Sequence, residues 1–344
     1  MIHFFDDTKV YVIAPAGVVT GGSELLHQFV DLLNRGGKEA YIVYYGAAEH
    51  KIADDYKKYN IKLKEEYDDA PHNIIVLFEG NFERALEIKH AQLLLWWLSV
   101  DLMYYGSASK LSLKDLFEFS PIFGFKTFLR RIRSLLFKGE NQFKNNHTIA
   151  DLARLDATNA YQAVYIQQYL YRHGFDNIIS LSDYINVDFV SETDKTIIKE
   201  DIILYNPKKG IKFTKKIINA NPDLKFVPIQ GLSRDGVVEL LKKAKVYIDF
   251  GFHPGKDRLP REAALSGCVV ITGRGGSAYY FEDVAIPSSN KFDAKNKNIN
   301  KISRKIRSSI NNYEEEKSVM DYYRYRINKE KAIFEQEVAE IMKL

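Results

Sequence analysis

The sequence predicts an α/β protein with two domains, each built on a parallel β-sheet. The chain has 344 residues, which exceeds the length at which a single hydrophobic core usually stops growing. Strand-like and helix-like segments alternate in both halves with short polar joints, as in βαβ units. A polar stretch at 186–200 separates the two series. We therefore expect domains at 1–185 and 201–344 with a linker between them.

The first series opens with a strand at 9–15 and a helix at 21–37, whose apolar residues follow helical spacing. Ser23 is the expected N-cap of this helix, and Gly36 and Gly37 end it. Further helices are expected within 148–175. The remaining predicted strands of this domain are AYIVYYG (40–46), NIIVLFEG (73–80), AQLLLWWLSV (91–100) and NIISLSDYI (177–185).

The second series repeats the architecture without repeating the sequence. Helices are expected between its strands, including RDGVVELLKKAK (234–245). From about residue 300 the chain is charged and helical, and we expect a terminal helix that packs back across a domain. The predicted strands are DIILYNP (201–207), KFVPIQG (225–231), VYIDFGF (246–252) and CVVITG (268–273).

Composition excludes several classes of protein. Lys and Arg number 49 against 45 Asp and Glu, and this net charge of +4 is too small for a whole-protein nucleic-acid binder. The single cysteine, Cys268, excludes an intramolecular disulfide and a thiolate metal site, and suits a reducing cytosol. The eight histidines show no metal-ligand spacing, so no metal is expected.

The N-terminus carries acids where a signal peptide needs basic residues, and it is better interpreted as the first strand. The longest apolar stretch, 93–105, is shorter than the roughly 18 residues of a spanning helix and contains Asp101. We expect no transmembrane helix and a cytoplasmic protein.

The stretch GFHPGKDRLPREAALSG (251–267) predicts an anion site. Pro260 suits the first position of a helix, with Leu259 as its cap. Free N–H groups and the helix dipole would stabilise an anion there by about 1 kcal/mol. Lys256 and Arg258 add positive charge, and Glu262 can point back to accept hydrogen bonds from a pair of sugar hydroxyls. Alternatively, Glu262 only caps its own helix.

A second glycine-rich turn, GRGGSA (273–278), has the shape G-x-G-x-x-A after a strand. Pro287 interrupts the chain before a full helix can form, so we interpret it as a phosphate-tolerant turn and not as a dinucleotide fingerprint.

Several segments together resemble a known family. KKG (208–210), IQGLSRDGVVELLKKAKVYIDFG (229–251) and PREAALSGCVVIT (260–272) resemble the C-terminal domain of GT-B glycosyltransferases, particularly the retaining family-four type. AGVVTGGSELLHQFVDLL (16–33) resembles the glycine-rich loop of the same class. The resemblance implies two Rossmann-like domains facing a central cleft, with a UDP- or GDP-sugar donor held mainly by the second and an acceptor by the first.

The resemblance also implies roles for individual residues. Glu262 would bind the donor ribose, and the backbone of Gly255 to Leu259 would meet the diphosphate together with Lys208 or Lys209. Gly231 and Leu232 would border the base, whereas Gly21, Gly22 and Ser23 would close over the phosphates. Further donor contacts are expected from His253, Lys256, Asp257 and Arg258. The family places a first Glu seven residues before the second, where this chain has Gly255, and Asp257 is the nearest acid.

The stretch WWLSVD (96–101) follows a predicted strand, at a place where ligands bind in open α/β sheets. Trp96 and Trp97 could stack on an acceptor sugar, and Asp101 could orient the acceptor hydroxyl or the donor. Alternatively the tryptophans belong to the core and Asp101 caps the next turn. With Glu262 and Lys209, Asp101 completes the expected catalytic set.

An insertion at about 106–148 shows no strand pattern and contains IFGFKTFLRRIRSLLFKG (122–139). As a helix, this segment has an apolar stripe flanked by Arg130, Arg131, Arg133 and two lysines, which suits an anionic membrane surface. The alternative is a helix that packs on its own domain.

The expected activity is glycosyl transfer, with retention, to a glycan or lipid-linked acceptor in cell-surface polysaccharide or glycoconjugate synthesis. The position of Gly255 leaves open a non-catalytic GT-B partner subunit. A nucleotide-sugar epimerase or a phosphorylase on the same fold is a further alternative.

Overall fold

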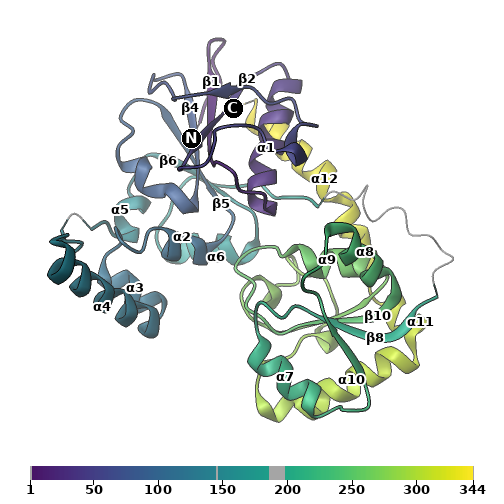
Figure 1. The fold of residues 1–344 in the computed structure, drawn as a ribbon. Helices are drawn as coiled ribbons and strands as arrows, with labels where there is room; N and C mark the ends of the chain where they lie inside the picture. The colour runs from purple at the N-terminus through teal and green to yellow at the C-terminus, as the bar shows by residue number, and fades with distance from the viewer. Residues whose placement is uncertain (1, 145, 186–197, 344) are drawn as a thin grey trace. The chain divides into compact units, whose positions relative to one another are not determined.

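The computed structural model describes residues 2–144, 146–185 and 198–343, so most of the predicted linker at 186–200 lies outside the described residues. The chain forms two compact units (Figure 1). Unit 1 comprises Met1–Gln162, Ile166–Ser182 and Phe334–Leu344, and unit 2 comprises Ala163–Tyr165 and Asp183–Ile333. Each unit contains one parallel sheet, which confirms the predicted fold class. The predicted second domain differs at its end, because Phe334–Leu344 belongs to unit 1.

The sheet of unit 1 has seven parallel strands in the order β3-β2-β1-β4-β5-β6-β7. The chain adds strands on one side of β1 and then crosses to the other side at β4. The strands are β1 (Lys9–Pro15), β2 (Glu39–Tyr45), β3 (Leu63–Lys64), β4 (Ile74–Phe78), β5 (Gln92–Trp97), β6 (Ala157–Tyr161) and β7 (Ile178–Ser180).

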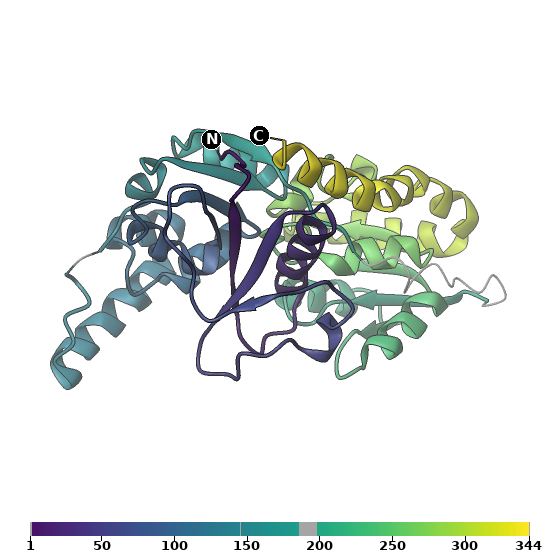
Figure 2. The same ribbon diagram turned by 90° about the horizontal axis from the view of Figure 1, so that it is seen from above.

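Helix α1 (Gly21–Arg35) lies against β1 and β2, as Figure 2 shows. Its cap is Thr20, whose hydroxyl accepts a hydrogen bond from the Ser23 amide, so the expected cap at Ser23 is wrong. The other helices of this unit are η1 (Asp54–Tyr56), η2 (Glu79–Leu86), α2 (Val100–Gly106), α3 (Leu113–Phe119), α4 (Pro121–Lys138), α5 (Ile149–Ala153) and α6 (Val164–Arg172), whose first two residues belong to unit 2.

Helices α5 and α6 lie within 148–175 as predicted, but this range also contains a strand that was not predicted. Strand β6 lies inside this range and pairs with β5, with Leu93 opposite Ala157. Its sequence, ATNAY, offers neither alternation nor a β-branched run, so the neighbouring strand decides its conformation.

The sheet of unit 2 has four parallel strands in the order β11-β10-β8-β9, sandwiched between two hydrophobic cores. The strands are β8 (Glu200–Tyr205), β9 (Lys225–Pro228), β10 (Ala244–Asp249) and β11 (Val269–Thr272). Leu204 and Tyr247 face a core built with α8 and α9, whereas Ile203 and Ile248 face a core built with α7 and α10. Figure 1 shows the two pairs of helices on opposite sides of the strands. Successive residues thus alternate between faces, as a buried strand requires.

The helices of unit 2 are α7 (Ile211–Asn219), α8 (Arg234–Lys243), α9 (Arg258–Leu265), η4 (Ser277–Tyr279), η5 (Ser288–Asn290), η6 (Asn296–Asn298), α10 (Ile299–Asn311) and α11 (Tyr313–Ser318). The terminal helix α12 (Asp321–Ile341) starts in this unit, and the residues from Phe334 onward belong to unit 1.

Candidate functional site

The order of the strands in unit 2 creates a topological switch between β8 and β10. These two strands are neighbours, with Tyr205 opposite Ile248, although α7, β9 and α8 separate them along the chain. Loops that leave the carboxyl ends of two such strands form the usual binding crevice of an open α/β sheet. Here the loop at 206–210, with Lys208 and Lys209, meets the loop at 250–257, as the predicted anion site requires.

Two glycines allow these loops to touch backbone to backbone. Gly210 has φ +66°, and a Cβ atom there would lie 2.5 Å from the Gly251 nitrogen. A Cβ on Gly251 would lie 2.5 Å from Lys209 Cγ. Lys209 therefore extends across the second loop, where its ammonium donates to the Phe252 carbonyl at 3.4 Å and pairs with Asp257.

Helix α9 begins earlier than predicted. Asp257 is its N-cap, with extended backbone angles, and Arg258 is the first helical residue. Leu259 is therefore not the cap, and Pro260 occupies the third helical position, where a missing N–H costs no intrahelical bond. Glu262 falls in the second turn, so the interpretation of Glu262 as a capping residue is wrong.

Glu262 is buried and lies between two arginines. Its Oε1 is 2.7 Å from Nη2 of Arg234, the first residue of α8, and 3.4 Å from Nε of Arg258. Arg234 was not predicted from the sequence. Its place in the sequence, three residues after Gly231 and next to the segment expected to border the base, is the one feature that could have identified it as a site residue. The site thus combines one carboxylate with two guanidinium groups that suit a diphosphate.

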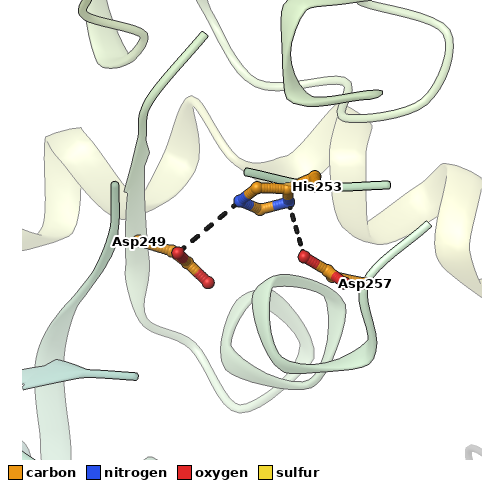
Figure 3. A group of neighbouring side chains, drawn as sticks. All are labelled: Asp249, His253 and Asp257. Carbon is orange, nitrogen blue, oxygen red and sulfur yellow. Dashed lines mark ion pairs between the residues drawn. The ribbon is translucent and has the colours of Figure 1, made fainter. Parts of the chain in front are cut away.

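His253 does not reach the surface. Its side chain is 0% exposed and lies between Asp249, at the end of β10, and Asp257 (Figure 3). Nδ1 is 2.9 Å from Asp257 Oδ2, and Nε2 is 3.6 Å from Asp249 Oδ1. Burial lowers the pKa of His253, but the two carboxylates outweigh burial and leave this pKa above its ordinary value. The predicted direct contact between His253 and the donor is therefore wrong.

Asp249, His253 and Asp257 are residue types that could hold a metal ion, and their ligand atoms lie within 4.8 Å of one another. The arrangement suits an imidazolium better, because the two ring nitrogens face different carboxylates and Asp257 also pairs with Lys209. The prediction that the protein needs no metal stays a prediction.

Lys256 lies near two acids that also bind Arg261. Its Nζ lies 3.8 Å from Asp183 and 3.9 Å from Glu330, both of which also bind the buried Arg261. Arg261 is paired with Asp183 at 2.6 Å and Glu330 at 2.7 Å. These contacts explain how Arg261 can be buried here. The predicted contact between Lys256 and phosphate stays a prediction.

The remaining predicted donor residues of unit 2 lie around the same switch. Lys208 is exposed, and Gly231 and Leu232 are exposed in the loop before α8. Gly255 is buried, and its carbonyl accepts a hydrogen bond of 2.6 Å from the Ser277 hydroxyl. The turn at 273–278 leads only into the short helix η4, so the sequence-based rejection of a dinucleotide fingerprint is confirmed. Binding of a nucleotide by these residues stays a prediction.

In unit 1, Gly21, Gly22 and Ser23 form the first turn of α1, directly after the carboxyl end of β1. Asp101 is the second residue of α2, which Ser99 caps. Each therefore lies at a strand end of the sheet, as predicted. Their roles toward donor and acceptor stay predictions.

Trp96 and Trp97 belong to the core, and both are 0% exposed. Trp96 Nε1 donates to the Leu181 carbonyl at 2.9 Å, and Trp97 Nε1 donates to Asn159 Oδ1 at 3.2 Å. Stacking on a sugar requires an exposed ring face, so the predicted acceptor contact of both residues is wrong.

The insertion at 106–148 forms helices α3 and α4, and the amphipathic segment is helical as predicted. Arg130 and Arg133 are exposed on α4. Arg131 is buried instead and donates to the carbonyls of Ala108 and Leu111 at 2.7 and 2.6 Å, so its predicted role at a membrane is wrong. Within residues 2–144, 146–185 and 198–343, no helix is both long and apolar enough to span a bilayer.

Sequence inspection missed Glu79, a buried acid directly after β4. Its Oε2 accepts a hydrogen bond of 2.8 Å from the Leu98 amide, which follows β5. Burial raises the pKa of Glu79 to about 8, so the side chain is largely protonated at neutral pH. The signal available in the sequence was an acid at the end of the apolar run NIIVLFEG.

No family model and no curated protein sequence matches the chain. Solved structures do match. Sucrose-phosphate synthase from Thermosynechococcus elongatus has a TM-score of 0.63 at 10% identity, covering 97% of this chain and 98% of that one. HepE from Anabaena, in complex with UDP, has a TM-score of 0.59 at 10% identity, covering 97% and 99%. TarM from S. aureus has a TM-score of 0.52 at 14% identity, covering 80% and 56%. At these identities the likeness concerns the fold, which is the GT-B fold of glycosyltransferases.

Proposed function

We propose that this chain is a glycosyltransferase that takes its sugar from a nucleoside-diphosphate donor, with UDP-sugars the first candidates. The observation that carries the proposal is the strand switch in unit 2. It brings together Lys209, Arg234, Arg258 and the carboxylate of Glu262 beside the N-terminus of α9. Cations and free amides suit a diphosphate, and a carboxylate suits ribose hydroxyls. HepE, of the same fold, has been solved with UDP and with UDP-glucose.

In the proposed reaction, the bond between the anomeric carbon and the diphosphate oxygen breaks, and the acceptor hydroxyl forms a new bond on the same face of the sugar. The acceptor proton leaves with the departing diphosphate. Lys209 and Arg258 stabilise the negative charge that develops on the leaving group, so no metal is required for that task. In unit 1, Asp101 orients the acceptor hydroxyl.

The acceptor is a glycan or a lipid-linked sugar. TarM, another protein of this fold, has been solved with UDP and a GlcNAc-glycerol. In this chain the argument for a lipid-linked acceptor comes from α4. Its exposed apolar residues Ile122, Phe125, Leu129 and Leu136 recur at helical spacing, and Ile122 and Leu136 are each 72% exposed.

The charge of α4 points to an anionic bilayer. The helix contains five basic residues and no acid. Arg131 is buried and binds backbone carbonyls of its own unit. The other four, Lys126, Arg130, Arg133 and Lys138, are exposed. At about 1 kcal/mol for each basic residue near such a surface, these four support reversible docking. We therefore propose that the enzyme acts on the cytoplasmic face of a membrane, in the synthesis of surface polysaccharide or glycoconjugate.

Isothermal titration of the full chain with UDP, GDP and UDP-glucose tests the donor site. We expect one nucleotide to bind, and Glu262→Gln to weaken that binding at least tenfold. Hydrolysis or transfer of the donor sugar, followed by NMR of the anomeric proton, then reports turnover and retention. Binding without turnover on any donor would favour a partner subunit, and a changed sugar without acceptor would favour an epimerase. No binding of any nucleotide contradicts the proposal.

Sedimentation with vesicles tests the membrane surface. We expect the chain to bind vesicles containing phosphatidylglycerol and not vesicles of phosphatidylcholine alone. Replacing both Arg130 and Arg133 with Glu should abolish binding. Replacing Lys297 and Lys301 with Glu is the matched control, because both are exposed on unit 2 and the net charge changes equally. Equal loss in the control, or no binding by the wild type, contradicts a specific surface on α4.

A further inference from the structure

We propose that His253 is a positioning residue of the donor site: as an imidazolium between Asp249 and Asp257, it fixes Asp257, and through Asp257 it places the ammonium of Lys209 for the donor diphosphate. This inference rests on the proposed function, because it assumes that Lys209 meets the diphosphate. His253 would thus influence how strongly the donor binds without touching the donor.

The buried ring of His253 has a carboxylate on each side. The two nitrogens of His253 face carboxylates from different elements, one at the end of β10 and one at the start of α9 (Figure 3). Asp249 is itself held, because its Oδ1 accepts from the Gly251 amide at 2.9 Å and its Oδ2 accepts from the Tyr247 hydroxyl at 3.0 Å. The imidazole therefore bridges a rigid strand end and the loop that forms the anion site.

The backbone of His253 is fixed by the second glycine-rich turn. The His253 amide donates to the Gly275 carbonyl at 3.2 Å, and the Ser277 amide donates to the His253 carbonyl at 2.8 Å. A Cβ on Gly276 would lie 2.0 Å from the His253 oxygen, so only glycine fits there. The turn at 273–278 thus holds the backbone of the loop at 250–257. This contact explains the glycines of the turn without phosphate binding.

Asp257 is available to His253 and Lys209 because it does not cap its own helix. An N-cap carboxylate usually accepts from the amides at the second or third helical position. Asp257 makes no such bond, and the third position is Pro260, which has no N–H. Its carboxylate instead lies between the His253 ring and the Lys209 ammonium. One acid is thus shared by two cations.

The charges of the cluster explain why protonation matters. Asp249, Asp257, Lys209 and protonated His253 sum to zero. Loss of the imidazole proton leaves a net charge of −1 beneath the loop at 250–257, and the neutral ring can then donate to only one of the two carboxylates. Both changes disfavour a diphosphate. The hydroxyl of Tyr247, which faces Asp249, stays protonated because burial and the neighbouring Asp249 raise its pKa well above the usual range.

Burial lowers the pKa of His253, but Asp249 and Asp257 outweigh burial and raise this pKa above its ordinary value. Burial would raise the pKa of Asp257, but His253 and Lys209 hold this pKa below its ordinary value. Asp257 is therefore ionised at the pH values at which His253 titrates. Donor affinity should be full at pH values below the pKa of His253 and should fall as the pH rises through it.

Calorimetric titration of the full chain with UDP-glucose between about pH 6 and 9 tests the inference, because both phosphates of this donor are esterified and keep a constant charge. We expect the wild type to lose about tenfold in affinity across the range. Asp249→Asn should keep the affinity at low pH and move the midpoint of the loss to lower pH. His253→Asn should bind weakly at every pH without a midpoint. Asp201→Asn, an exposed acid at the start of β8, is the control that should match the wild type.

NMR of the histidine ring nitrogens in the full chain reads the protonation state without any donor and covers the possibility that His253→Asn does not fold. We expect a doubly protonated ring at neutral pH. A neutral ring, an affinity independent of pH, or an Asp249→Asn midpoint equal to that of the wild type would overturn this inference while leaving nucleotide binding intact. Absence of binding of UDP, UDP-glucose and GDP at every pH would instead overturn the proposed function, and this inference with it.

Discussion

Glu262 and Arg234 form an ion pair in unit 2, with Oε1 of the first 2.7 Å from Nη2 of the second. The two residues lie on different helices, α9 and α8, and their contact joins the carboxylate implied by the family resemblance to a guanidinium that the sequence did not reveal. Because Glu262 is buried and Arg234 is 43% exposed, the arginine links an interior carboxylate to the surface of the candidate donor site.

Replacing Arg234 with Met should weaken UDP binding by one to two orders of magnitude. A hydrogen bond to a charged group contributes about 1.5–3 kcal/mol, and every 1.4 kcal/mol is a tenfold change in affinity. Arg234→Lys should recover only part of the loss, because an ammonium lacks the planar fork of a guanidinium. Calorimetric titration with UDP measures both.

The matched control for Arg234 is Glu239→Gln, an exposed change on the same helix. It should leave UDP binding unchanged. Wild-type affinity in Arg234→Met would show that the pair with Glu262 has no part in nucleotide binding.

Replacing Arg261 with Met should destabilise the protein by about 3–5 kcal/mol, because the buried Asp183 and Glu330 would lose their shortest ion pairs and keep only the more distant Lys256. Adding Asp183→Asn and Glu330→Gln to this variant should recover much of the loss. Chemical denaturation of the three proteins measures the differences. Arg307→Met, which removes a pair with the exposed Asp223, is the control and should change stability little. Similar effects of the two arginine replacements would contradict a buried network.

Glu79 should make the protein less stable as the pH rises. Its pKa is about 8 in the folded protein and near 4.5 when unfolded, so between these values the folded state holds a proton that the unfolded state has lost. Stability therefore falls from about pH 4.5 to about pH 8, by at most about 1.4 kcal/mol per pH unit from this group. Glu79→Gln should remove this part of the pH dependence. Identical pH profiles of the free energy of unfolding in both proteins would contradict a protonated Glu79.

Gly210→Ala should reduce both stability and donor binding. The residue has φ +66°, which costs a non-glycine residue about 1 kcal/mol, and the new methyl group would collide with the backbone of Gly251 and Phe250. Displacement of that loop would move Lys209. Gly37→Ala is the control, because Gly37 has φ +79° with no atom in reach of its Cβ. The control should lose stability through strain alone and keep UDP binding; equal effects would show that close packing of the loops is unimportant.

Most of the fold followed from local pattern. The strands at 9–15 and 268–273 and the helix at 21–37 are visible because apolar runs and helical spacing are properties of neighbouring residues. Strand β6 was missed for the opposite reason, since a short polar sequence becomes a strand only when β5 supplies its hydrogen bonds. The helix caps at Thr20 and Asp257 also differ from prediction. Where a helix begins depends on the backbone angles and on the tertiary contacts of the residues at its start.

The candidate site was predictable as a region and not as a set of contacts. The lysines at 208–209 and the loop before Pro260 can be recognised from their sequence and from the family resemblance. The sequence does not show which of these side chains are buried, so His253, Trp96, Trp97 and Arg131 were assigned to ligands or to a membrane although they lie in the interior.

The sequence by itself determined two parallel α/β sheets and a basic amphipathic helix in the first unit, and it predicted an anion site in the loop before α9, since these depend on spacing and composition. Only the tertiary structure decided that β8 and β10 are neighbours, that Arg234 meets Glu262, and that His253 lies between Asp249 and Asp257. Each of these contacts joins residues from separate elements of one sheet-and-helix unit. The partners of a buried charge are therefore fixed by the order of the strands, which no local pattern contains.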